Sequence, residues 1–235
     1  INGLTQKQIS NRYLTLITPS PFTFSIWSVI YILLLISVIV MIVRKNDSYY
    51  QNAIDKISLL FKISCVINIA WIVAFSFVLV ELSSIFILGF VVTLVFICSK
   101  LLEVSEGKQW LLPLSFGIYS GWLFIATVVN IAAALTKLEW DGFGLSKETW
   151  GIIMLIIAIV LIIVVLMRIR NAAFPLPVAW AYFGIYQFLK SPAGFNGEYG
   201  TLQIISLVGM IVLIIVAVFQ FIHNNFSVLP KFSKK

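Results

Sequence analysis

The sequence predicts an all-α protein, a polytopic integral membrane helical bundle with about seven transmembrane helices. Three features indicate this class. Of the 235 residues, 61% are hydrophobic and only 11% are charged, with a mean hydropathy of +1.06. A soluble domain of ordinary composition carries about 25% charged residues. Several apolar runs follow one another along the chain, and each is close to the roughly 20 residues that a bilayer-spanning helix needs.

The first four apolar runs are bounded by charged residues or short turns. The first follows Pro19 and Pro21 and ends at the polar stretch 44–47. Only Glu81 and its neighbours separate the second run from the third, so we expect these two helices to form a tight antiparallel hairpin. The predicted spans are residues 22–43, 57–80, 82–102 and 110–135.

Three further apolar runs follow a charged loop. Arg168 and Arg170 close the fifth run, and Pro175 and Pro177 open the sixth. The seventh precedes a basic tail. The predicted spans are residues 150–167, 174–189 and 201–222.

These runs divide the chain into five parts. An extramembrane N-terminal segment, which is a candidate lid for a pocket, precedes a four-helix portion. A loop then leads to an additional three-helix membrane portion and a basic cytoplasmic tail. The parts are residues 1–21, 22–135, 136–149, 150–222 and 223–235.

The distribution of positive charge predicts the orientation of the chain. The net charge is +7, but the Lys and Arg residues are scattered at the predicted helix ends and form no basic stripe, which argues against nucleic acid as a partner. Five of them fall on the N-terminal side of the membrane and eleven on the other side. Because positive charge favours the cytoplasmic side, we expect this chain to begin outside and to end in the cytoplasm, in a bacterial plasma membrane.

Ionisable residues offer little catalytic or metal-binding chemistry. No Asp, Glu, His or Arg lies in the middle of a predicted span, and Lys62 is close enough to an end for its amine to reach the interface. This pattern counts against an ion-coupled pump. Cys65 and Cys98 are expected to be small core residues, and His223 has no neighbouring ligand. We therefore predict neither catalytic residues nor metal ligands.

Uncharged polar and aromatic side chains share helix faces instead. Asn68 and Trp71 are three residues apart, and Tyr119, Trp122, Ala126 and Asn130 follow at spacings of three, four and four. Both Asn residues could simply join neighbouring helices by hydrogen bonds. The two Trp residues lie well inside their spans, where a buried indole N–H needs a partner, and Asn would supply one. The stripes therefore fit either helix packing or the wall of a pocket.

A small-residue motif, Gly117-x-x-x-Gly121, lies in the fourth span. Such a motif lets two helices approach closely. It could serve a homodimer or seat a neighbouring helix of the same chain.

Three motifs, taken in order, resemble the TspO/MBR family, the tryptophan-rich sensory proteins related to the mitochondrial translocator protein. Trp27 and Tyr31 match the aromatic entry of that family, and Asn68 and Trp71 match its N-x-x-W helix. The fourth span matches the W-x-x-x-A-T-x-x-N helix with Trp122, Ala126, Thr127 and Asn130, preceded by Tyr119. The resemblance covers about residues 18–135.

The resemblance implies a pocket inside the helix bundle. In that family, five helices surround a site for porphyrins, haem-like tetrapyrroles, sterols and synthetic aromatic ligands. Spans one to four here would correspond to the second to fifth family helices, so the resemblance leads us to expect a preceding helix. Two departures stand out: the paired family prolines appear here as Pro19-Ser20-Pro21 without the Trp that follows them, and residues 150–222 have no counterpart in the five-helix core.

The leading hypothesis is thus a membrane sensor or carrier that binds a flat apolar ligand, a tetrapyrrole or a sterol-like molecule. Two alternatives stay open: a Trp-dependent enzyme that degrades porphyrins in light, and a non-catalytic scaffold or accessory subunit of a membrane complex. No cofactor is required, and the expected partners are the lipid bilayer, a hydrophobic ligand and a second copy or membrane partner. The predicted ligand-binding residues are Phe24, Trp27, Tyr31, Asn68, Trp71, Tyr119, Trp122, Ala126 and Asn130.

Overall fold

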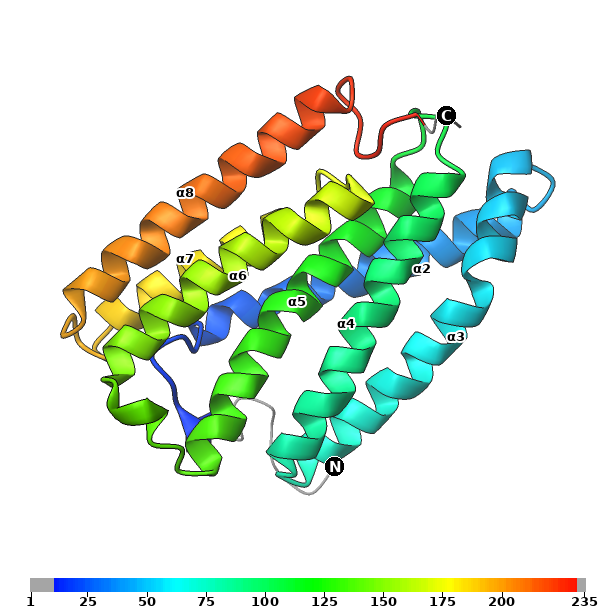
Figure 1. Ribbon diagram of the computed structural model, residues 1–235. Coiled ribbons are helices and arrows are strands. Elements are labelled where there is room, and N and C mark those ends of the chain that lie inside the picture. Colours follow the sequence, from blue (N-terminus) through cyan, green and yellow to red (C-terminus); the bar gives the residue numbers. More distant parts are fainter. Residues whose placement is uncertain (1–10, 232–235) are drawn as a thin grey trace.

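The computed structural model describes residues 11–231, and seven α-helices make up most of that range (Figure 1). Three short 3-10 helices accompany them: η1 (Asn11–Tyr13), η2 (Pro21–Ser25) and η3 (Gly142–Gly144). The predicted all-helical bundle is confirmed. The α-helices are α2 (Ile26–Val43), α3 (Ser48–Ser76), α4 (Val80–Glu103), α5 (Leu111–Lys137), α6 (Lys147–Ile169), α7 (Leu176–Lys190) and α8 (Gly200–His223).

Six segments are long and apolar enough to cross a membrane when η2 and α2 are counted together as Pro21–Val43. The exception is α7, whose 15 residues extend about 22 Å, against about 30 Å for the hydrocarbon core of a bilayer. Nine of these 15 residues are buried. The seven predicted spans therefore correspond to six full-length helices and one short helix that is largely enclosed by its neighbours.

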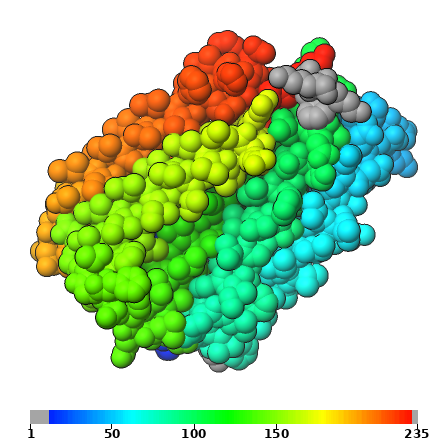
Figure 2. All heavy atoms as spheres, in the orientation of Figure 1, coloured from blue at the N-terminus to red at the C-terminus, as the bar shows by residue number. Residues whose placement is uncertain are grey.

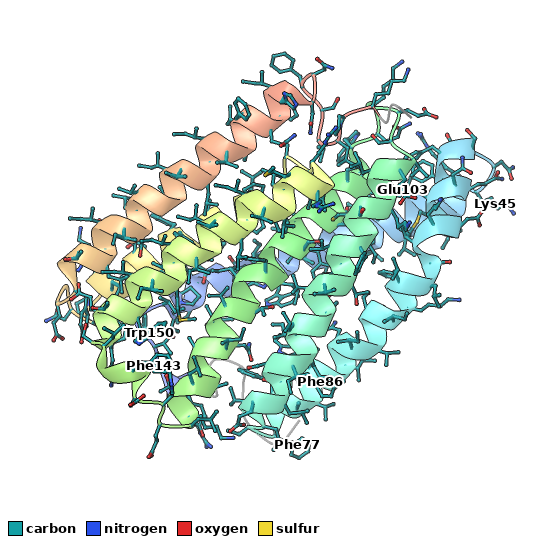
Figure 3. The ribbon with its side chains drawn as sticks, in the orientation of Figure 1. Lys45, Phe77, Phe86, Glu103, Phe143 and Trp150 are labelled. Atoms are coloured by element: carbon teal, nitrogen blue, oxygen red, sulfur yellow. The ribbon has the colours of Figure 1, made fainter. Side chains whose placement is uncertain are left out.

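The helices lie side by side with roughly aligned axes (Figure 1). One face of the bundle is covered by α8, α6, α4 and α3 (Figure 2). Lys45 and Glu103 lie at one end of the bundle, and Phe143 and Trp150 lie towards the other (Figure 3). The central helix is α5, which packs against α2, α4, α6 and α7.

Polar side chains set two of the helix boundaries. α3 begins at Ser48, earlier than the predicted residue 57, because the Asp47 carboxylate accepts hydrogen bonds from the N–H groups of Tyr49 and Tyr50. The predicted hairpin of α3 and α4 is confirmed, with only residues 77–79 between the helices. Lys137, at the end of α5, closes this turn by pairing with Glu81 at 2.7 Å.

Gly117 and Gly121 seat a segment of the same chain against α5. A Cβ atom at Gly117 would collide with the side-chain oxygen of Asn171, and one at Gly121 would collide with the backbone oxygen of Phe174. The turn between α6 and α7 therefore rests directly on the backbone of α5. Of the two roles considered for the Gly-x-x-x-Gly motif, the structure assigns it the contact within the chain.

Two asparagines satisfy the backbone of this buried turn. Asn171 is fully buried; its amide donates to the carbonyl of Pro113 at 2.7 Å and its oxygen accepts from the N–H of Ala173 at 3.0 Å. From beyond the end of α8, Asn224 donates to the carbonyl of Arg170 at 2.8 Å. Non-helical backbone inside a membrane protein needs such internal partners because lipid offers none.

The N-terminal entry of α2 is joined to α7. The indole N–H of Trp180 donates to the carbonyl of Thr23 at 3.0 Å, and the N–H of Ser20 donates to the carbonyl of Gly184, also at 3.0 Å. The Phe22 ring meets Trp180 edge-on, with 5.3 Å between centroids. The three C-terminal helices are thus packed onto the four-helix portion and do not form a separate body.

We predict that Gly121→Ala destabilises the protein by about 1–3 kcal/mol, because the added methyl group overlaps backbone atoms that cannot move aside cheaply. Gly89→Ala, on α4, is the matched control, since a Cβ atom there meets nothing within 4 Å. The control should be neutral or stabilising by about 0.5–1 kcal/mol because Ala favours helix over Gly. Thermal unfolding of both variants in detergent measures the difference, and equal melting temperatures would contradict the close approach at Gly121.

Candidate functional site

An aromatic cavity lies between η2, α2, α3, α5 and α7. Its volume is about 60 Å³, which is room for a few water molecules. Its walls are almost entirely apolar, with Asn130 as the one amide among them. The lining residues are Tyr13, Pro19, Phe24, Trp27, Trp71, Phe75, Val80, Trp122, Ile125, Ala126, Val129, Asn130, Ala133 and Ala181.

Trp27 is the centre of the aromatic cluster that forms this wall. Its ring lies nearly parallel to Trp71, with 6.2 Å between centroids and 27° between planes, and meets Trp122 edge-on at 6.2 Å and 86°. Phe24 meets Trp122 edge-on from one turn earlier, at 5.9 Å. Offset-stacked and edge-to-face pairs in this distance range are favourable. The cluster therefore holds three indole rings from three different helices at one place.

Polar atoms in this cluster are left without partners. Among the described residues, the indole N–H groups of Trp71 and Trp122 and the side-chain oxygen of Asn68 are buried and make no hydrogen bond. The expectation that Asn would accept from these indoles is wrong, because the asparagines of α3 and α5 do not bond to them. A buried polar atom with no partner costs about 1–3 kcal/mol, so three of them around one aromatic cluster need an explanation.

Asn130 has a structural partner on the neighbouring helix. Its side-chain oxygen accepts from the hydroxyl of Ser83 at 2.9 Å, and its backbone carbonyl accepts from the hydroxyl of Ser84 at 3.1 Å. These bonds join α4 to α5, as expected for an interhelical contact inside a membrane. Asn130 also lines the cavity. The same residue therefore joins two helices and forms part of the cavity wall.

The segment before α2 closes one side of the cavity. Tyr13 and Pro19 lie in its wall, and the hydrogen bond from Ser20 to Gly184 holds the segment against α7. Gly184 permits this contact because a Cβ atom there would collide with the methyl group of Thr23. Tyr13 and Pro19 thus contribute part of the cavity wall, and the role of residues 1–21 as a lid stays a prediction. Residues 1–10 of this segment lie outside the described residues.

Comparison with known families now identifies the chain. A family model described as TSPO-like protein matches residues 1–219. The chain belongs to the TSPO-like protein family. The match includes α6, α7 and most of α8. These helices therefore fall within the family pattern, although the motif resemblance ended near residue 135. No curated protein and no solved structure matches the chain.

Family membership establishes the general class. The protein is an integral membrane protein, and its family suggests ligand binding or sensing in the membrane. Its helices place lipid-facing apolar residues on the outside; Leu35, Val66 and Ile85 are each more than 60% exposed. Cys65 belongs to this outer surface, which corrects the prediction that it is a core residue, whereas Cys98 is buried as expected. The helical period of α3 turns position 65 outwards together with position 66.

The structure brings six of the nine predicted binding residues to the cavity wall and leaves three outside it. Tyr31 stacks on Trp27 at 5.5 Å but is 49% exposed. Tyr119 packs edge-on against both Trp27 and Phe90, and Asn68 is not among the lining residues. Helical spacing identified the helix faces that point to the cavity, but it did not show which side chains on these faces reach it. The six that do are Phe24, Trp27, Trp71, Trp122, Ala126 and Asn130.

Several lining residues were missed from the sequence. Phe75 and Ala133 continue the predicted stripes one turn beyond Trp71 and Asn130, so extending the helical period would have found them. No local signal marks Ala181, because it is a small apolar residue of α7 that reaches the cavity only through tertiary packing. As for metal ions, none of the described residues form a group of three or more His, Cys, Asp or Glu that could hold one.

We predict that Asn130→Ala lowers the stability of the protein and that Asn68→Ala does not. Asn130→Ala removes the acceptor of Ser83 and should destabilise the protein by about 1–2 kcal/mol. Asn68→Ala removes an unpaired buried oxygen and should leave stability unchanged or slightly raised. Thermal unfolding in detergent without ligand compares the two variants. Equal losses would show that Asn68 has a structural partner after all.

Proposed function

We propose that the aromatic cavity binds a flat, largely apolar ligand of the tetrapyrrole class, and that the protein acts as a sensor or carrier for it. The observation that carries this proposal is the pair of buried, unpaired indole N–H groups on Trp71 and Trp122, whose rings line the cavity. Indole N–H groups usually find an acceptor when buried. A ligand with an oxygen or nitrogen acceptor at its edge would provide it.

The shape of the aromatic cluster suits a planar ligand. Trp27 and Trp71 present nearly parallel faces, and a flat π-system stacks favourably on such faces, at about 0.5–1.5 kcal/mol for each aromatic pair beyond the burial of area. A porphyrin combines such a face with ring nitrogens and carboxylate oxygens. Binding sites of this kind are mostly apolar with a few placed polar groups, which is the composition of the cavity wall.

The cavity must widen to admit a ligand of this size. Sites for drug-sized molecules occupy about 300–1,000 Å³, far more than the 60 Å³ of the closed cavity. The wall formed by α2 is the best candidate to move, because only 11% of the membrane-spanning stretch that contains it is buried inside the protein, against 56% for α5. Displacing this wall would separate Trp27 from Trp71 and Trp122 and create the space between their rings.

The experiment is a titration of the purified protein with protoporphyrin IX, followed by quenching of tryptophan fluorescence. We expect saturable binding that weakens about threefold to tenfold in Trp71→Phe and in Trp122→Phe, because each change keeps a ring but removes one donor worth about 0.5–1.5 kcal/mol. Trp110→Phe is the matched control, since Trp110 is 59% exposed and lies outside the cavity.

Three further outcomes bear on this function and its alternatives. Absence of saturable binding, or equal affinity in all three variants, would reject the aromatic cavity as the site and favour a scaffold role. Bleaching of bound protoporphyrin in light that requires Trp122 would show that the same cavity performs oxidative chemistry. Competition by cholesterol would extend the ligand class from planar tetrapyrroles to sterols.

A further inference from the structure

A second, larger cavity lies at the end of the bundle that carries Phe143 and Trp150 (Figure 3). Its volume is about 710 Å³, within the range of about 300–1,000 Å³ that is usual for small-molecule sites. It is enclosed by residues 14–17, the end of α5, the loop through η3, the start of α6 and the loop between α7 and α8. It shares no lining residue with the aromatic cavity.

The aromatic part of this second cavity is held in a defined arrangement. The rings of Trp140 and Trp150 lie 4.8 Å apart between centroids, and the indole N–H of Trp150 donates to the carbonyl of Gly142 at 2.6 Å. Gly142 has a φ of 66°, and a Cβ atom there would lie 2.6 Å from the Trp150 nitrogen. Glycine is therefore required for the loop to fold onto the indole. The η3 loop is thus fixed against Trp150 and forms part of the cavity wall.

Two carboxylates outnumber one amine among the lining residues. Glu139, Asp141 and Lys147 all line the cavity and are exposed. Within residues 11–231, none of the three belongs to an ion pair. Asp141 uses one carboxylate oxygen to accept from the N–H of Phe143 at 3.0 Å, which leaves the other available. The cavity therefore combines mixed polar and apolar walls, which include two Trp rings, with a surplus of one negative charge.

We propose that this cavity is a binding site for lipophilic cations, molecules with an aromatic body and a single positive charge. The Trp140 and Trp150 rings would stabilise such a ligand in two ways. They offer apolar contact to its aromatic body, and their faces attract its positive charge. The carboxylates of Glu139 and Asp141 favour positive over negative ligands. The site is independent of the ligand proposed for the aromatic cavity.

The test compares tetraphenylphosphonium with tetraphenylborate, two ions of nearly the same shape and opposite charge. Binding is measured by equilibrium dialysis against protein in nanodiscs, with empty nanodiscs subtracted. We expect saturable binding of the cation. The double variant Glu139→Gln/Asp141→Asn should weaken it about threefold to tenfold, and this effect should shrink at high salt. Asp141→Asn keeps an acceptor for Phe143, so the loop should stay folded.

Two other variants test whether the charges that line the cavity determine the affinity for the cation. Glu148→Gln removes a nearby carboxylate that does not line the cavity and should leave affinity unchanged, whereas Lys147→Gln should strengthen binding of the cation. The proposal fails if tetraphenylborate binds as tightly with the same response to the variants. It also fails if the double variant and Glu148→Gln give equal affinities, or if the cation does not saturate.

Discussion

The aromatic cavity depends on how closely the turn before α7 can approach α5. Gly117 and Gly121 remove the two side chains that would hold Asn171 and Phe174 away from the helix. This contact lets the short α7 sit inside the bundle, where Ala181 reaches the cavity. Without the close approach, α5 would lose a neighbour on this side and the cavity would lose part of its wall. The shape of the cavity thus depends on the close packing at these two glycines.

Several buried polar groups that join the helices have partners, unlike the indole N–H groups of the aromatic cluster. The hydroxyls of Ser37 and Ser115 join α2 to α5 at 2.8 Å, and the hydroxyl of Tyr182 donates to the carbonyl of Leu155 at 2.6 Å. The indole N–H groups of Trp71 and Trp122 have none among the described residues. Departures from full satisfaction tend to occur where a protein binds something. Both unpaired donors belong to residues of the cavity wall, where the proposed ligand would meet them.

The N-terminal segment and α5 separate two cavities of different character. Tyr13 and Pro19 face the small aromatic cavity, and the residues between them, 14–17, line the larger one. The small cavity is built mainly from the helices that carry the three family motifs. The large one needs α6 and the loop before α8. The additional helices thus complete the first cavity through α7 and create the second.

Local features of the sequence determined the helical membrane class and the helix faces from which six of the predicted residues line the aromatic cavity. Apolar runs of membrane length identify spans because the bilayer acts on each helix separately, and the helical period aligned Trp122 with Ala126 and Asn130. Only the tertiary structure decided that Asn130 bonds to Ser83, that the Trp71 N–H stays unpaired and that α7 is enclosed. The second cavity, formed by three stretches that lie far apart in the sequence, left no local signal. Hydrophobicity is a property of each segment, whereas hydrogen-bond partners and cavities are set by which segments meet.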